Sequence, residues 1–204
     1  YGSEKSYAVL AESLQCFGGS GYLQDYPIEQ YIRDAKIDTL YEGTTAIQGL
    51  DLFFRKMVKD QFGAITALGR EISTLAATGP DELARERQLL GTALQDVQAM
   101  IQTMAGFAVA SGSDSAQVYR AGLNTTRLLF TVGDVVVAWL LLRQATVALA
   151  ALEGDVSASD AAFYRGKVAA AQWFCRQVLP HVSAERAVLE ATDLDVMELT
   201  DSAF

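Results

Sequence analysis

The chain has 204 residues, half of them hydrophobic and a fifth charged, so it can bury a sizeable core in one large or two small domains. Its net charge of −9 argues against a nucleic-acid partner, because phosphate binding needs clustered lysine and arginine. Only three prolines occur, which favours a mostly helical protein.

The first part of the chain predicts two short helices joined by a turn. The run Gly18–Gly21 ends the first helix, and Pro27 fits the first position of a second helix that runs to about Lys36. The glycine run is not a dinucleotide-binding fingerprint, because Gln24 stands where glycine or alanine is required and a helix precedes it. The first helix covers about residues 3–17, with apolar side chains at helical spacing: Tyr7, Leu10, Leu14 and Phe17.

A longer helix is predicted from about Ile47 towards Leu75. The pair Gly79–Pro80 ends this region, so we expect the main internal boundary near residue 76. Residues 1–75 and 76–204 would then form two parts. The apolar stripe of the predicted helix consists of Ile47, Leu50, Phe54, Met57, Val58, Phe62 and Ile65.

The rest of the chain predicts three long helices, a shorter one and a tail. The first two cover about residues 81–111 and 116–152, and the second is apolar on several faces, as a central helix surrounded by neighbours would be. The third begins at Ser159–Asp160 and Pro180 ends or bends it. A short helix over about 184–191 precedes an acidic tail, Asp193–Asp201, which is a solvated surface or a docking site for a basic partner. No strand alternation persists, so the predicted fold class is all-α.

The sequence favours neither a disulfide, nor a metal site, nor a membrane span. Cys16 and Cys175 are interpreted as buried thiols of a reducing compartment, because no Cys-x-x-Cys spacing occurs. His181 is the single histidine and is expected to be a capping or solvated residue, which leaves no clustered metal ligands. The most apolar run, Val135–Leu142, is too short to cross a bilayer, so no transmembrane segment is expected.

Glu42 is the carboxylate whose position suggests chemistry. It lies between Tyr41 and Gly43, ahead of a long amphipathic pattern. If Thr44 or Thr45 caps that helix, free backbone N–H groups and the positive end of the helix dipole point at whatever is bound beside Glu42. Glu42 is then a positioned base or an ordinary helix-start glutamate, and spacing alone favours the ordinary glutamate, because acidic residues are common in first turns.

Several separated segments resemble, in order, the carboxyl-terminal signature of the acyl-CoA dehydrogenases. They are Gln15–Tyr22, Tyr26–Glu29, Arg33–Ile37, Tyr41–Thr44 and Ile47–Gln48. The resemblance covers about residues 1–58. The motif Gln48–Leu52 followed by Arg55 and Lys56, with a long helical remainder, is similar to larger members that carry an extra carboxyl-terminal helical domain. Those members act on fatty acyl-CoAs or on 3-methylmercaptopropionyl-CoA.

The resemblance implies roles at the matching positions. Glu42 corresponds to the catalytic base, which removes the pro-R proton from the substrate α-carbon while a hydride leaves the β-carbon for FAD, giving a trans-2-enoyl-CoA. Its backbone amide is expected to hydrogen-bond the thioester carbonyl, Gly43 leaves room for the acyl-CoA, and Tyr41 lines the same pocket. Apolar neighbours, Leu40 and Ile47 among them, are expected to help desolvate the carboxylate. Ala46 departs from members with a polar residue there and receives no side-chain role. FAD contacts are implied for Gln15, Gly18, Gly19 and Thr44, the first three with FAD bound mainly by a neighbouring subunit.

The resemblance also implies partners outside the chain. An amino-terminal helical domain and a middle β-domain hold the flavin ring and much of the acyl-CoA in this family, so the 204 residues alone are expected to be inactive. Electrons would pass to an electron-transfer flavoprotein, in a homo-oligomer (dimer or tetramer) of the bacterial cytoplasm or the mitochondrial matrix. Residues 76–204 would cover a subunit interface or shape the binding of long acyl chains. The alternative from a different class is a non-catalytic helical module that serves subunit assembly.

Overall fold

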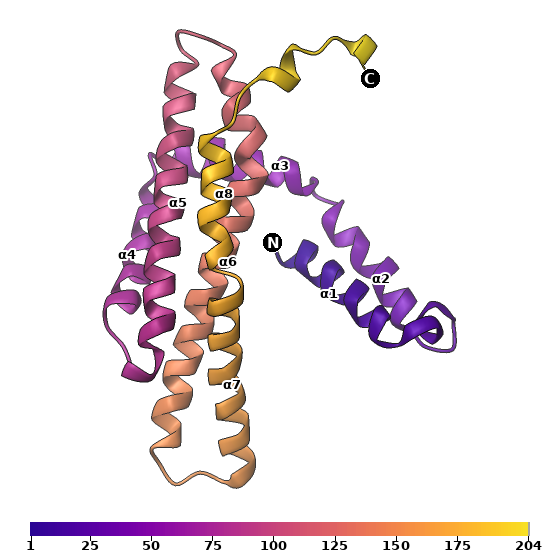
Figure 1. The fold of residues 1–204 in the computed structure, drawn as a ribbon, viewed down its shortest axis with the longest axis vertical. Coiled ribbons are helices and arrows are strands. Elements are labelled where there is room, and N and C mark those ends of the chain that lie inside the picture. Colours follow the sequence, from indigo (N-terminus) through magenta and orange to yellow (C-terminus); the bar gives the residue numbers. More distant parts are fainter. Residues whose placement is uncertain (204) are drawn as a thin grey trace.

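The computed structural model describes residues 1–203, and every regular element in that range is helical. The predicted all-α fold class is therefore confirmed. Two helices, α1 (Gly2–Cys16) and α2 (Ile28–Lys36), form a hairpin that projects from the side of a bundle of long helices (Figure 1). The short helix α3 (Thr45–Leu50) packs on α6 and joins the hairpin to the bundle.

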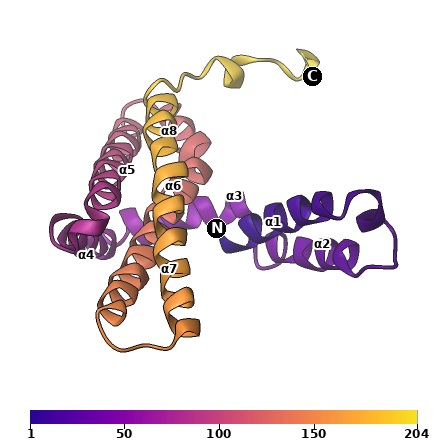
Figure 2. The same ribbon diagram turned by 60° about the horizontal axis from the view of Figure 1, so that its bottom comes forward.

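The bundle consists of five helices. They are α4 (Gly63–Ala77), α5 (Ala84–Ala110), α6 (Gln117–Leu152), α7 (Ala158–Gln177) and α8 (Pro180–Glu190). Short helical turns lie between and after the long elements: η1 (Gly18–Tyr22), η2 (Ile37–Thr39), η4 (Asp81–Leu83), η5 (Asp195–Glu198) and η6 (Asp201–Ala203). Figure 2 shows the hairpin pointing away from the bundle in a second view, so the two parts are well separated along most of α1 and α2.

The prediction of a single helix from Ile47 towards Leu75 is wrong, because the chain turns before α4. α3 continues into a π-helical segment, η3 (Asp51–Val58), and then Gln61 and Phe62 take left-handed φ angles of 52° and 60°. The Asp60 carboxylate accepts a hydrogen bond of 2.7 Å from a backbone N–H in the first turn of α4, which stabilises the new helix start. A left-handed φ angle at a residue other than glycine does not change the apolar pattern of the sequence. The predicted apolar stripe therefore continued across this turn.

The helix after this turn belongs spatially to the bundle. α4 packs against both α5 and α6, so residues 63–77 lie beside the helices that follow them in the chain. The Gly79–Pro80 loop leads from α4 through η4 into α5, and α4 and α5 are neighbours in the bundle. The division of the chain at residue 76 stays a prediction, and the backbone itself changes direction earlier, at residues 61–62.

α6 is the central helix of the bundle, as its apolar faces predict. It packs against α3, α4, α5, α7 and α8. By length and composition alone it is the one helix within residues 1–203 that could cross a membrane, although the eight-residue run Val135–Leu142 is too short by itself. It also carries Arg127, Asp134 and Arg143, and its neighbours on several sides are those of a core helix.

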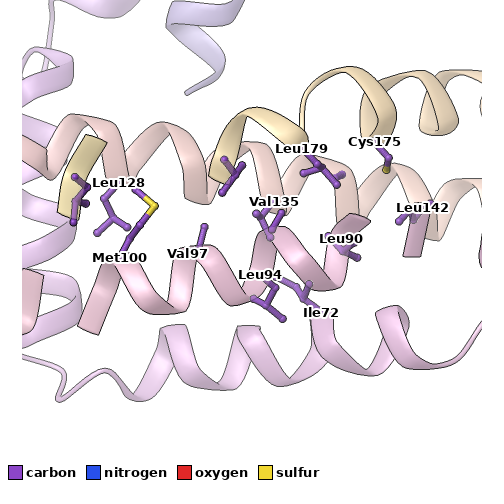
Figure 3. Close-up of a cluster of buried hydrophobic side chains, with 14 of the residues drawn as sticks. Ile72, Leu90, Leu94, Val97, Met100, Leu128, Val135, Leu142, Cys175 and Leu179 are labelled. Atoms are coloured by element: carbon purple, nitrogen blue, oxygen red, sulfur yellow. The ribbon is translucent and has the colours of Figure 1, made fainter. Parts of the chain in front are cut away.

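The core lies where α4, α5, α6 and α7 meet (Figure 3). Figure 3 shows side chains from these helices pointing toward one another, with Leu179 joining them from the link before α8. Each fully buried side chain of this size contributes about 1.5–3 kcal/mol relative to an exposed one. Fully or almost fully buried members are Phe53, Met57, Leu90, Met100, Met104, Leu128, Leu142, Cys175 and Leu179.

The starts of α7 and α8 differ from the predicted ones. The Ser157 hydroxyl accepts a hydrogen bond of 3.1 Å from the Asp160 backbone N–H, so Ser157 caps α7, which begins at Ala158, just before the predicted start at Ser159–Asp160. Pro180 opens α8, because a proline in the first turn loses no intrahelical hydrogen bond. The short helix predicted from residue 184 therefore begins four residues earlier.

The two cysteines have different environments. Cys175 is buried in the core as predicted, but the prediction is wrong for Cys16, which is exposed, because it lies in the last turn of α1, at the tip of the hairpin and away from the bundle. Burial, with the negative charge of Glu86 as a smaller cause, raises the pKa of the Cys175 thiol to about 12.

We therefore expect a thiol reagent at pH 8 to modify one cysteine of the native chain, Cys16, and to reach Cys175 only after unfolding. The neutral thiol of Cys175 stabilises the fold fully below the ordinary thiol pKa of about 8.5, and this contribution is lost as the pH rises towards 12. Mass spectrometry after labelling in native buffer and in urea measures both thiols. Equal labelling rates in native buffer would contradict the expectation.

Candidate functional site

Glu42 lies in the loop between η2 and α3, in an unusual backbone conformation. Its φ angle is +58°, and Gly43 follows with +96°, so two consecutive left-handed residues redirect the chain into α3. The Glu42 carbonyl oxygen accepts a hydrogen bond of 2.7 Å from Gln48 Nε2, which ties this loop to α3. Left-handed residues other than glycine are enriched at functional sites.

The Glu42 side chain is free to act on another molecule. It is exposed, and its carboxylate makes no hydrogen bond or ion pair with any residue of the described range 1–203. A Cβ added to Gly43 would lie 3.1 Å from Ile47 Cγ2 and 3.3 Å from Gln48 Nε2, on a backbone that side chains rarely adopt. Gly43 is therefore required by the loop itself as well as suited to a close approach by a ligand.

The expected side-chain cap at the start of α3 is absent. Thr44 occupies the N-cap position without a side-chain cap hydrogen bond. The Thr45 hydroxyl instead donates to Glu4 Oε1, so it ties the start of α3 to the start of α1. This contact between the side chains of α1 and α3 fixes the base of the hairpin.

The apolar residues around Glu42 are open to solvent in this chain. Leu40, Tyr41 and Ile47 are 50%, 57% and 54% exposed. The prediction is that they desolvate the carboxylate together with a bound acyl chain, and by themselves they do not enclose it. Sequence patterns predict apolar character, whereas enclosure depends on what packs over the loop.

The remaining predicted ligand contacts lie at the tip of the hairpin. Gln15 is in the last turn of α1, and Gly18 and Gly19 are in η1, all three exposed. Gly18 has a φ angle of +62°, and an added Cβ on either glycine would meet no atom within 4 Å. The backbone of this turn is thus accessible to a large polar group.

Gly21, in the same turn, has a structural role. It is buried, and an added Cβ would lie 2.7 Å from the Leu14 carbonyl oxygen and 2.8 Å from Phe17 Cβ. We expect Gly21→Ala to destabilise the hairpin by about 1–3 kcal/mol, because the contacting atoms belong to the backbone or lie next to it. Faster amide hydrogen exchange in α1 and α2 would show this, with Gly19→Ala as the matched control. Equal exchange in the two variants would contradict the packing argument.

The structure separates the site residues into two groups. Tyr41, Glu42, Gly43 and Thr44 lie together at the base of the hairpin, next to α3, whereas the tip group of Gln15, Gly18 and Gly19 lies at the far end of α1 (Figure 1). With 15 residues at 1.5 Å each, α1 spans about 22 Å between them. The two groups cannot both touch one small chemical group.

The hairpin also exposes a large apolar surface that the sequence pattern did not reveal. Exposed apolar areas of this extent mark interaction surfaces. No signal in the sequence distinguishes these residues from core residues, because an apolar residue type does not by itself indicate burial. They include Val9, Phe17, Tyr22, Leu23, Tyr26, Tyr31, Ile37, Leu40, Tyr41 and Ile47.

Two family models together cover nearly the whole chain. One, described as acyl-CoA dehydrogenase, C-terminal domain, matches residues 1–55, and the other, described as acetyl-CoA dehydrogenase C-terminal like, matches residues 64–200. The chain belongs to the acyl-CoA dehydrogenase family. The residues between the two matches contain the left-handed turn before α4.

Individual relatives agree with this assignment. Over its full length the chain is 50% identical to the broad-specificity linear acyl-CoA dehydrogenase FadE5 of Mycobacterium tuberculosis, of which it covers 34%. Over 93% of its length it is 32% identical to 3-methylmercaptopropionyl-CoA dehydrogenase of Ruegeria pomeroyi, of which it covers 31%. Over its full length it is 27% identical to a butyryl-CoA dehydrogenase of Syntrophomonas wolfei, of which it covers 33%. The chain spans about a third of the length of these relatives.

Proposed function

We propose that this chain is the carboxyl-terminal part of a flavin-dependent acyl-CoA dehydrogenase, in which Glu42 removes the substrate α-proton. The observation that carries the proposal is the Glu42 loop, where an unpaired carboxylate is held by a left-handed backbone that Gln48 fixes to α3. The loop lies in the part of the chain that matches the family's C-terminal domain. A positioned carboxylate without a protein partner is suited to general-base chemistry.

The chemistry requires more than a carboxylate. The α-proton of a thioester is too weakly acidic for a carboxylate in water, so the base must be desolvated and its pKa raised. Exposed Leu40, Tyr41 and Ile47 would supply one wall of a dry site once an acyl chain and the rest of the enzyme cover them. The backbone N–H of Glu42 would stabilise the developing enolate oxygen. When bound, FAD supplies the hydride acceptor that completes oxidation to the trans-2-enoyl-CoA.

The tip and base of the hairpin suit contacts with FAD in two different places. Gly18 and Gly19 present an accessible backbone, and Gln15 adds an amide beside them, so this group fits a polar part of FAD held mainly by a neighbouring subunit. Thr44 at the base fits a separate contact. The distance along α1 supports two separate contact regions. Contact with FAD held mainly by a neighbouring subunit would require a homo-oligomer, a dimer or tetramer. Electron-transfer flavoprotein would reoxidise the flavin.

For the substrate we propose straight-chain fatty acyl-CoAs. The support is the 50% identity over the full chain to a relative named for broad specificity towards linear acyl-CoAs. The alternative is 3-methylmercaptopropionyl-CoA, supported by the 32% identity to the enzyme named for that compound. A panel of acyl-CoAs from short to long, together with the methylthio compound, compared by kcat/KM, separates the two.

The complete protein tests the proposed function through its colour. We expect it to purify yellow with bound FAD and to bleach when acyl-CoA is added without an electron acceptor. A colourless protein that never takes up FAD would instead support the non-catalytic helical assembly module.

A further inference from the structure

The segment after α8 lies off the bundle. Figure 1 shows residues 193–203, here called the arm, leaving the end of α8 and extending away from the long helices. Val196, Met197 and Leu199 of the arm are 65%, 46% and 53% exposed. Its carboxylates form no ion pair with any residue between 1 and 203: Asp193, Asp195, Glu198 and Asp201. The arm therefore combines exposed apolar side chains with carboxylates that form no ion pair within the described residues.

A groove at the other end of the bundle is complementary to the arm, because it is apolar and has cations beside it. The α6–α7 groove has a volume of about 680 Å³ and is largely apolar. Its open side chains include Leu140, Val147 and Phe163, which are 42%, 68% and 60% exposed. Its principal lining residues are Leu140, Arg143 and Val147 from α6 and Phe163, Tyr164 and Lys167 from α7. Three exposed apolar side chains in one groove mark a surface that another element covers.

The cations of the α6–α7 groove lack acidic partners. The Arg143 guanidinium lies 4.9 Å from the centre of the Trp139 ring, and Lys167 Nζ lies 5.3 Å from the centre of the Phe163 ring and 3.3 Å from Gln144 Oε1. Neither cation pairs with a carboxylate of the described part of the chain. In a chain with a net charge of −9, two unpaired cations beside an apolar groove suit an acidic, apolar segment.

The arm cannot reach the groove of its own chain. α7 and α8 lie end to end (Figures 1 and 2), so the rise from Lys167 to the end of α8 is roughly 35 Å at 1.5 Å per residue. Met197 lies six residues beyond Ala191, which allows at most about 20 Å of extended chain. An arm that fills this groove must therefore belong to a second copy.

We propose that the arm of one copy of this protein docks in the α6–α7 groove of a second copy. Val196, Met197 and Leu199 fill the apolar groove, and the arm carboxylates face Arg143 and Lys167. Because the arm and the groove lie at opposite ends of the bundle, two copies packed antiparallel exchange arms reciprocally, which gives a closed two-fold contact. This contact is independent of the flavin chemistry proposed for the hairpin.

Cysteine cross-linking in the complete protein tests the arm exchange. In a Cys16→Ser background, one chain carries Met197→Cys and a differently tagged, co-expressed chain carries Phe163→Cys. Docking holds the thiol of Met197→Cys beside that of Phe163→Cys at a millimolar effective concentration, so the interchain disulfide should form about 100-fold faster than with the control Ala169→Cys, which the docked arm does not reach. Ala169 is exposed on α7, on a face turned away from Phe163. Equal rates for Phe163→Cys and Ala169→Cys overturn the proposal.

Charge reversal tests the predicted partners of the arm. Lys167→Glu in the chain with Phe163→Cys should slow the disulfide roughly 10-fold, and Glu198→Lys in the chain with Met197→Cys should restore the rate. A loss that Glu198→Lys does not restore contradicts the charge pairing. Labelling of Phe163→Cys with a small thiol reagent provides a second check in the protein without the arm cysteine. If that thiol is inaccessible even after residues 193–204 are deleted, another element covers the groove and the proposal is wrong.

Discussion

Glu42→Gln should lower the rate of α,β-dehydrogenation by the complete protein about 100- to 10,000-fold, the range that a positioned general base contributes. The glutamine amide keeps the size of the side chain but cannot accept the α-proton. The loop should survive, because its conformation depends on Gly43 and on the bond from Gln48 to the Glu42 carbonyl oxygen. Acyl-CoA binding is therefore expected to persist while kcat falls.

Turnover and binding must be measured separately to interpret this variant. Stopped-flow absorbance reports flavin reduction, and equilibrium titration with acyl-CoA reports binding. Glu71→Gln is a matched control, because Glu71 is an exposed carboxylate on α4, away from the hairpin, and its kcat should match that of the unaltered protein. Retained turnover in Glu42→Gln removes Glu42 from the role of base. Loss of binding together with turnover would indicate that Glu42 supports the loop instead.

The helices whose limits hydrophobic periodicity predicted best are those that pack along one face against a neighbouring helix. α1, α2, α5 and α6 begin and end within a few residues of their predicted limits, because their apolar residues pack on adjacent helices at the helical period. The break at Gln61 and Phe62 escaped prediction because both residues take left-handed angles without glycine or proline as a signal. The turn is followed by the Asp60 bond to the start of α4 and by the packing of α4 on α5, and the apolar pattern records neither.

At the candidate site, too, the residue types could be predicted from the sequence, whereas their conformation and surroundings required the structure. The motif around Glu42 could be recognised from residue types in order, but the left-handed φ of Glu42 and the bond from Gln48 required the structure. Tyr41 and Ile47 were expected to shield the carboxylate, and they are open in this chain. Enclosure depends on what packs over the loop, and the apolar pattern of this stretch does not record it.

Arg176→Met should lower the free energy of unfolding by about 3–5 kcal/mol, because it strands a buried carboxylate. Arg176 Nε donates to Glu86 Oε1 at 2.5 Å, and the Glu86 side chain is only 1% exposed. The other oxygen, Oε2, is buried without a hydrogen-bond partner among residues 1–203. Without the guanidinium, the carboxylate has neither water nor a counter-charge, so urea unfolding should show the loss directly.

The cost should be asymmetric, since the Arg176 side chain is 38% exposed and can turn towards solvent when its partner is removed. Glu86→Leu should therefore cost less than Arg176→Met, and the two changes together should recover most of the lost stability, because an apolar pair leaves no buried charge. Arg165→Met on the same helix is the control; Arg165 is exposed and forms no ion pair within the described residues, so its effect should stay within about 0.5 kcal/mol. If Arg176→Met behaved like Arg165→Met, the Glu86 carboxylate would have another source of solvation, and the α5–α7 contact would depend on its apolar side chains alone.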